Sequence, residues 1–161
     1  MNNEIFVKMA LDGWQGQLNA TSNLFNKLSD EQLMQEIAPS RNRGVYLLGH
    51  LIAVHDMMLP LLLLGDAVYP EFHHPFVDLP DKAVTDLPPI AELRAQWATL
   101  NEKITTLFAS LTPDEWFTRH ANISPEDFAK EPHRNRLNVM LVRTLHLSNH
   151  RGQLALLMPK G

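Results

Sequence analysis

Apolar side chains recur at helical spacing along four stretches of the chain, and no stretch alternates in the manner of a β-strand. The stretches cover residues 3–28, 45–64, 89–111 and 135–159, each bound being approximate. Spacings of three, four and seven residues place apolar side chains on one face of a helix. The pattern therefore predicts an all-α fold with four long helices.

Residues that begin and end helices support these boundaries. Residues 29–32 (Ser-Asp-Glu-Gln) have the sequence of a capping box and predict a short helix that ends before Pro39. Pro89 suits the first position of the third long helix. We expect Gly65 to end the second long helix, and Pro60 to kink that helix or end it early.

Two of the three connections between the long helices are extended. Residues 65–88 form a connection of 24 residues, which is longer than most connections in compact domains. The other runs up to residue 136, and cap sequences at 112–115 and 124–127 predict short helices inside it. A connection as long as the first can run back along a bundle, so the second and third long helices can be parallel. We therefore predict a four-helix bundle whose two long connections carry short helices.

Composition narrows the functional classes. A chain of 161 residues fits one domain, 1–161, and is long enough to bury a core without cross-links. It has no cysteine, which excludes disulfides and thiolate ligands, so any thiol chemistry needs an external thiol. The net charge of -4, without blocks of like charge, argues against a nucleic-acid partner.

The apolar stretch at residues 45–64 has the length of a membrane span. It contains His50, His55 and Asp56, and ionisable groups at bilayer depth are costly. A helix that is apolar all round also suits the buried helix of a bundle, and the N-terminus lacks the pattern of a signal peptide. We expect a cytoplasmic protein without a membrane partner. The same stretch has more apolar surface than one bundle face needs, which favours a homodimer.

Three histidines are candidates for one metal site. His146 and His150 are four residues apart, which on a helix means about 40° of azimuth and about 6 Å of rise. Both imidazoles can therefore reach one point, as HxxxH pairs do when they bind a metal. His50 lies near the same depth in the second helix, on an apolar face where it needs a partner. His55 is turned about 140° from His50 and should not join.

Three neutral imidazoles and one open position form the catalytic arrangement for zinc, whereas structural zinc sites have four protein ligands. Nickel, iron and manganese are alternatives, and any of them lowers the pKa of a bound water or thiol. The alternative without metal is that these histidines form hydrogen bonds in the core. Gln153 can hydrogen-bond a ligand histidine, while Asn149 and Arg151 are either exposed or contact a substrate.

Other polar and aromatic residues are weaker candidates. The tryptophans are expected in the core or in the wall of a cleft: Trp14, Trp97 and Trp116. The histidines of the connections are expected in solvent: His73, His74, His120 and His133. Arg41 and Arg43 are either solvated or hold an acidic cosubstrate. Asp12 and Asp56 are candidate general bases, although no spacing places them near the histidines.

Two segments resemble the signatures of DinB-like proteins. They are residues 44–53 (Gly-Val-Tyr-Leu-Leu-Gly-His-Leu-Ile-Ala) and 146–154 (His-Leu-Ser-Asn-His-Arg-Gly-Gln-Leu). The resemblance spans nearly the whole chain. It implies an up-down-down-up four-helix bundle, often homodimeric, in which His50, His146 and His150 hold a divalent metal. Zinc or nickel is expected ahead of iron or manganese.

The same resemblance implies a class of function. DinB-like proteins include S-transferases that use low-molecular-weight thiols such as bacillithiol, and a mycothiol-dependent maleylpyruvate isomerase. We therefore expect a metal-dependent enzyme, of thiol S-transferase or hydrolase-like type, that acts on a small molecule. The alternative is a non-catalytic metal-binding protein, such as a sensor or a stress-response bundle. Only the histidines match a general motif, so no substrate-binding residue is carried over.

Overall fold

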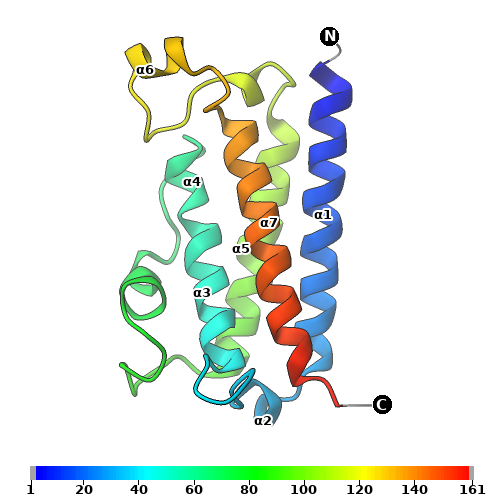
Figure 1. The fold of residues 1–161 in the computed structure, drawn as a ribbon, viewed down its shortest axis with the longest axis vertical. Coiled ribbons are helices and arrows are strands. Elements are labelled where there is room, and N and C mark those ends of the chain that lie inside the picture. The colour runs from blue at the N-terminus through cyan, green and yellow to red at the C-terminus, as the bar shows by residue number, and fades with distance from the viewer. Residues whose placement is uncertain (1–2, 160–161) are drawn as a thin grey trace.

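The computed structural model describes residues 3–159, and the regular elements of this part are all helical (Figure 1). The long helices are α1 (Asn3–Lys27), α3 (Gly44–Asp56), α5 (Ile90–Ser110) and α7 (Arg136–Leu154). The shorter elements are α2 (Asp30–Leu33), α4 (Met58–Leu61), α6 (Pro125–Lys130), the 3₁₀ helices η1 (Pro70–Phe72), η3 (Glu115–Phe117) and η4 (Ala155–Leu157), and the π-helix η2 (His74–Asp78). The predicted all-α class is confirmed.

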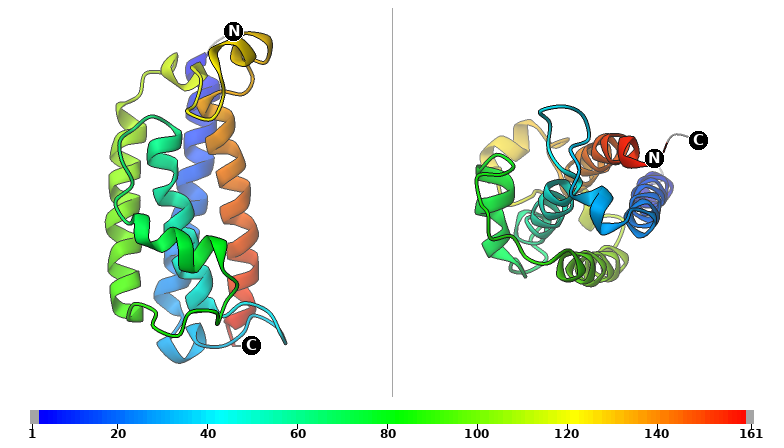
Figure 2. Two further views of the ribbon diagram at one scale, coloured as in Figure 1. Left: turned by 90° about the vertical axis from the view of Figure 1, so that its left-hand side faces the viewer. Right: turned by 90° about the horizontal axis from the view of Figure 1, so that it is seen from below.

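The long helices are arranged as two pairs. Figure 1 shows α1 and α7 running in one direction and α3 and α5 running in the other. Helix α1 packs along α7, and α3 packs along α5, whereas α3 and α7 share fewer contacts. In the end-on view of Figure 2 the four helices surround a common core. The line along which α3 faces α7 is called the α3–α7 seam below.

Helix α3 is buried between its neighbouring helices and the connection that contains η1 and η2. All of its residues except His50 are buried. Among the described residues, Gly44–Leu61 is the one stretch long and apolar enough to cross a bilayer, and 78% of it is buried inside the protein. Its apolar surface is therefore used within the bundle. Apart from Leu63, which is 50% exposed, little of the apolar surface from which we expected a homodimer faces outward, so that argument loses its basis.

The second long helix ends early, as expected from Pro60, and does not reach residue 64. It breaks at Met57, and α4 ends at Leu61. Pro60 explains the break, since its ring lacks an N–H and clashes with the carbonyl four residues earlier, at the end of α3. Leu63 then adopts a φ of 58°. With the bonds from Leu63 N to Pro60 O and from Leu64 N to Leu59 O, this is a Schellman motif, so Leu63 has the role expected of Gly65.

Other helix boundaries follow the predicted caps. The Ser29 side chain accepts a hydrogen bond from the Gln32 backbone, and the Gln32 side chain accepts one from Ser29 N, which completes the capping box. Ser124 caps α6 by accepting from Asp127 N. Pro89 immediately precedes α5, one residue before the position that we predicted.

The long connection after α4 returns along α3 and is fixed at both ends of that helix. The Asp56 carboxylate accepts hydrogen bonds from the backbone N–H groups of Val68 and Tyr69. Near the other end, Arg43 binds Asp81 through its guanidinium and its backbone N–H. Burial raises the pKa of Asp81, but these hydrogen bonds and the charge of Arg43 outweigh it, so the pKa is lowered. The connection is therefore held against the helix that carries His50.

Candidate metal centre

The three predicted histidines meet at the α3–α7 seam. His50 comes from α3, and His146 and His150 come from successive turns of α7. The Nε2 atom of His146 lies 3.3 Å from Nε2 of His50 and 3.1 Å from Nε2 of His150. The ligand atoms of all three lie within 4.8 Å of one another, and each residue is half-buried. The predicted convergence is confirmed.

Hydrogen bonds on the far side of two rings direct their Nε2 lone pairs toward this point. His50 Nδ1 lies 2.7 Å from the carbonyl oxygen of Phe76, which can only accept, so Nδ1 carries the proton. His150 Nδ1 lies 2.8 Å from Oε1 of Gln153, which assigns the same tautomer to His150. Such outer hydrogen bonds orient histidine ligands in metal sites. The expectation that Gln153 hydrogen-bonds one of the histidines is confirmed.

The spacing of the nitrogens fits a metal ion. A tetrahedral zinc with Zn–N bonds of about 2.0–2.1 Å has ligand nitrogens roughly 3.3 Å apart, close to the two distances found at His146. Without a cation, the lone pairs of His50 and His150 both face His146, whose Nε2 can carry only one proton. A single cation is attractive to all three nitrogens at once, so the donor set fits a metal.

The three imidazoles are neutral near neutral pH. Burial lowers the pKa of His146 to about 3, with further contributions from the charges of His150, His50 and Arg143. Burial also lowers the pKa of His50 and of His150, and the hydrogen bonds to Phe76 and Gln153 only partly oppose it. Metal ligands must be deprotonated, and these three already are.

A glycine next to His50 makes room for the element that orients it. A Cβ atom on Gly49 would lie 2.2–2.4 Å from ring atoms of Phe76, which is fully buried in η2. The π-helix can therefore press against α3 only because residue 49 has no side chain. Sequence reasoning missed the Phe76 carbonyl, because a backbone acceptor has no residue-type signal. A glycine beside a histidine in the middle of a helix was the available clue.

His55 does not join the cluster, as predicted. It is fully buried between Trp14 and Trp97, with ring centroids 5.0 Å from each, and its Nδ1 lies 2.7 Å from Oδ1 of Asn101. Burial lowers its pKa to about 4. The three tryptophans are all in the core, with exposed fractions of 1% for Trp14, 4% for Trp97 and 0% for Trp116. His55 therefore belongs to this aromatic core.

The weaker candidates have structural partners instead. Asp12 pairs with Lys8 on the exposed face of α1, and Asp56 binds the backbone as described above. Arg43 is occupied by Asp81, so it is not free to hold an acidic cosubstrate. Neither aspartate is among the His, Asp and Glu side chains that the described residues bring together at the seam. The structure therefore does not support Asp12 or Asp56 as the general base.

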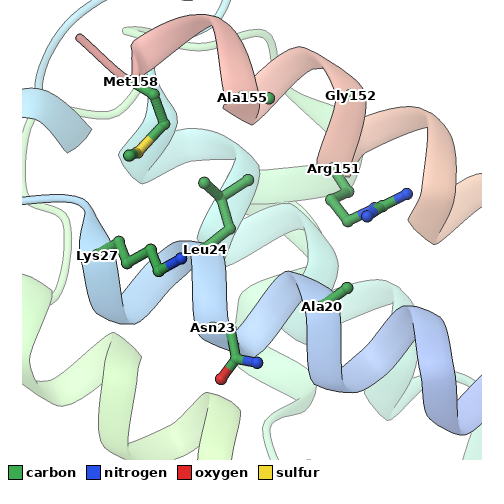
Figure 3. A pocket seen from close by; sticks show the side chains of 8 residues that line it. All are labelled: Ala20, Asn23, Leu24, Lys27, Arg151, Gly152, Ala155 and Met158. Atoms are coloured by element: carbon green, nitrogen blue, oxygen red, sulfur yellow. The ribbon is translucent and has the colours of Figure 1, made fainter. Parts of the chain in front are cut away.

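A groove lies between α1 and α7, on the side of α7 that faces away from the histidine cluster (Figure 3). It has a volume of about 480 Å³ and reaches the end of α7. Its lining residues are Ala20, Asn23, Leu24, Lys27, Arg151, Gly152, Ala155 and Met158. Arg151 faces this groove although it follows His150 in the chain, and no histidine lines it. The groove is therefore separate from the candidate centre.

One of two comparisons with known proteins finds a match. The family model described as the DinB superfamily matches residues 14–154, which include all three histidines. A comparison with curated proteins finds no significant match.

Proposed function

The chain belongs to the DinB superfamily, and on this premise we propose that it is a metal-dependent enzyme. In this proposal His50, His146 and His150 hold one divalent transition metal, with zinc or nickel preferred to iron or manganese. The observation that carries it is the convergence of one ring nitrogen from each of the three histidines within 4.8 Å of one another.

The openness of the centre favours catalysis over a purely structural metal. The described residues bring three histidines to the cluster and no fourth His, Asp or Glu. Three protein ligands with an open position are typical of catalytic zinc, and four of structural zinc. The three histidines are also only half-buried, so the cluster is not sealed inside the core.

The residues of this chain have distinct roles in the proposal. His50 and His150 present fixed Nε2 lone pairs, because Phe76 and Gln153 hold the Nδ1 protons. The buried wall beside them excludes water from the inner side, where Phe76 packs against Gly49. A divalent metal bound by these nitrogens supplies Lewis acidity, which favours the deprotonated form of a thiol or water.

We propose thiol S-transfer to a small electrophile as the reaction, with hydrolysis as the related alternative. The chain has no cysteine, so the thiol is a low-molecular-weight cosubstrate. A non-catalytic metal-binding bundle predicts the same metal content and no turnover. We also propose that the helices follow the up-down-down-up order, which the chain directions in Figure 1 support. We propose in addition that the protein is cytoplasmic.

The first experiment is elemental analysis of the purified protein beside a His50→Ala/His146→Ala variant. We expect about one transition metal per chain, which the variant loses while its circular dichroism stays helical. His133→Ala is the matched control, because this histidine is exposed in the connection before α7 and is not part of the cluster. Absence of metal after reconstitution with zinc, nickel or manganese would refute the proposal.

A second experiment separates the enzyme from the non-catalytic protein. The metal-loaded protein is incubated with small thiols and alkyl or epoxide electrophiles, and thioether formation is followed by mass spectrometry. Turnover that the double histidine variant lacks supports the enzyme. Stoichiometric metal without turnover, for thiols and for hydrolysable esters, supports the alternative.

A further inference from the structure

One cation beside the centre has no counter-charge. Arg143 lies on α7, one turn before His146, and its side chain is half-buried. Burial lowers its pKa, and no carboxylate is among the causes. Within residues 3–159 it forms no ion pair with an aspartate or glutamate. Burying part of a guanidinium costs free energy when no anion or hydrogen-bond acceptor compensates for the lost water. We therefore expect Arg143 to bind a partner that is not part of this chain.

Arg143 lines a pocket of about 250 Å³ that opens between α4, α7 and the connection after η3. The other lining residues are Met57, Pro60, Leu61, Ala121 and Asn122. Most of this wall is apolar, and Arg143 is the one charged residue in it. The volume accommodates a group of a few heavy atoms.

The pocket and the histidines lie along the same seam. Met57 is seven residues after His50, which places both on one side of the same helical path. Arg143 is three residues before His146, about 5 Å along α7. Helices α3 and α7 run in opposite directions (Figure 1). Moving forward from His50 to Met57 and backward from His146 to Arg143 therefore leads toward the same end of the bundle.

We infer that Arg143 and its pocket bind a carboxylate group of the substrate or cosubstrate whose other end reaches the three histidines. The inference rests on the proposed function and names the chemical class of its ligand. A planar guanidinium binds a carboxylate through two parallel hydrogen bonds. A phosphate monoester carries nearly two negative charges near neutral pH, whereas the pocket offers one positive charge. The site therefore fits a small thiol or electrophile with a single carboxylate.

Cobalt-loaded protein allows this inference to be tested without knowledge of the substrate. The probes are 3-mercaptopropionate and 3-mercaptopropionamide, which differ in charge but have the same length. Thiolate binding is read from the near-ultraviolet cobalt–sulfur absorption. We expect the carboxylate to bind at least about tenfold more tightly than the amide, as a charge-assisted bidentate pair implies. Arg143→Gln should reduce this ratio to about one.

Controls separate a local contact from a general effect of charge. Arg136→Gln removes one positive charge two turns earlier on the same helix, outside the pocket, and should keep the preference. Arg143→Lys keeps the charge but not the planar fork, and should retain part of it. An unchanged ratio in Arg143→Gln, with an intact cobalt spectrum, overturns the inference and leaves the proposed function standing.

A second arm does not depend on the metal. Propionate and propionamide are titrated into metal-free protein, and the Arg143 side-chain Nε–H signal, identified by its loss in Arg143→Gln, is followed by NMR. A saturable shift with propionate alone supports the anion site even if the protein fails to bind cobalt. In that case the anion site would stand, and the metal proposal would be decided by the reconstitution with zinc, nickel or manganese. Equal shifts with both probes, or none, contradict the inference.

Discussion

At the scale of single residues, the candidate centre depends on the hydrogen-bond acceptor of each histidine's Nδ1 atom. His50 and His150 each have an acceptor for the Nδ1 proton. His146 Nδ1 is buried and has no hydrogen-bond partner within the described residues. Two of the three rings are therefore fixed in orientation and tautomer, and His146 depends on packing alone. Changes to the outer acceptors should affect metal affinity more than they affect folding.

Gln153 gives the most direct test of this view. Gln153→Leu leaves the Nδ1 atom of His150 without its acceptor, and we expect metal affinity to fall about 10- to 100-fold. Gln153→Glu keeps an acceptor and should bind at least as tightly as the original protein. Both affinities are measured by competition with a chromogenic chelator. Equal affinity in Gln153→Leu and the original protein would show that the hydrogen bond has no such role.

His55 predicts a pH dependence of stability. Its pKa is about 4 in the folded protein and about 6.5 when unfolded. As the pH falls from 6.5 toward 4, the unfolded chain takes up a proton that the folded protein does not, so stability is lost over this range. The loss attributable to His55 approaches roughly 3 kcal/mol.

Urea unfolding of metal-free protein between pH 4.5 and 7 measures this effect. His55→Gln keeps a donor for Asn101 and removes the titrating group, so its free energy of unfolding should vary less with pH. The difference between the two slopes isolates His55 from the other histidines. Parallel curves would contradict the assignment of a depressed pKa to this residue.

At the scale of elements, the candidate centre needs the long connection as well as two helices. The π-helix η2 contributes no side chain to the cluster, yet its Phe76 carbonyl orients His50. The Tyr46 hydroxyl adds a second bond to this segment by donating to the Leu79 carbonyl. The connection is therefore part of the site, and a change that displaces it should loosen His50.

Gly49→Ala tests the contact between α3 and η2. The new methyl group meets the Phe76 ring, and overpacking of this kind costs about 1–3 kcal/mol, against a gain of up to about 1 kcal/mol in helix propensity. We expect lower stability and weaker metal binding together. Gly152→Ala is the control on α7, where a Cβ meets nothing within 4 Å, so it should be slightly stabilising. Thermal unfolding and chelator competition check both variants, and an unaltered Gly49→Ala protein would contradict this account.

The elements also show how far the sequence could be interpreted. The four long helices, the caps at Ser29 and Ser124 and the three histidines were predictable, because periodicity and side-chain spacing encode them. The end of α4 at Leu63 was not, since the left-handed position usually has glycine and Gly65 stood two residues away. The Phe76 carbonyl and the Arg143 pocket were not predictable either. Both arise where segments distant in sequence pack together.

At the scale of the whole molecule, the bundle leaves apolar side chains exposed on α1 and α7. On α1 these are Ile5, Phe6 and Met9, and on α7 they are Leu141, Val142 and Leu145. The two helices are neighbours, and these residues lie toward the same end of the bundle. Contiguous exposed apolar patches often mark protein–protein contacts, and these six residues are candidates for one. This surface, and not α3, is where we place a homodimer contact.

Sedimentation at micromolar concentration tests the homodimer. We expect a dimer that Met9→Lys/Leu145→Lys converts to a monomer, because two charges would be placed in the contact. Met34→Lys is the control, as Met34 is 49% exposed and lies outside α1 and α7. A monomer in the original protein would remove the homodimer from the proposal.

The α3–α7 seam has a consequence for motion. Helices α3 and α7 approach each other at fewer positions than the helices within either pair, so we expect the seam to open locally more readily than the contacts within each pair. His50 and His146 lie on opposite sides of that opening. A ligand that binds both residues binds only the closed form, and it therefore stabilises that form relative to the open one. Amide hydrogens along the seam should therefore exchange with solvent more slowly when the centre is filled, because a bound metal would limit the opening of the bundle.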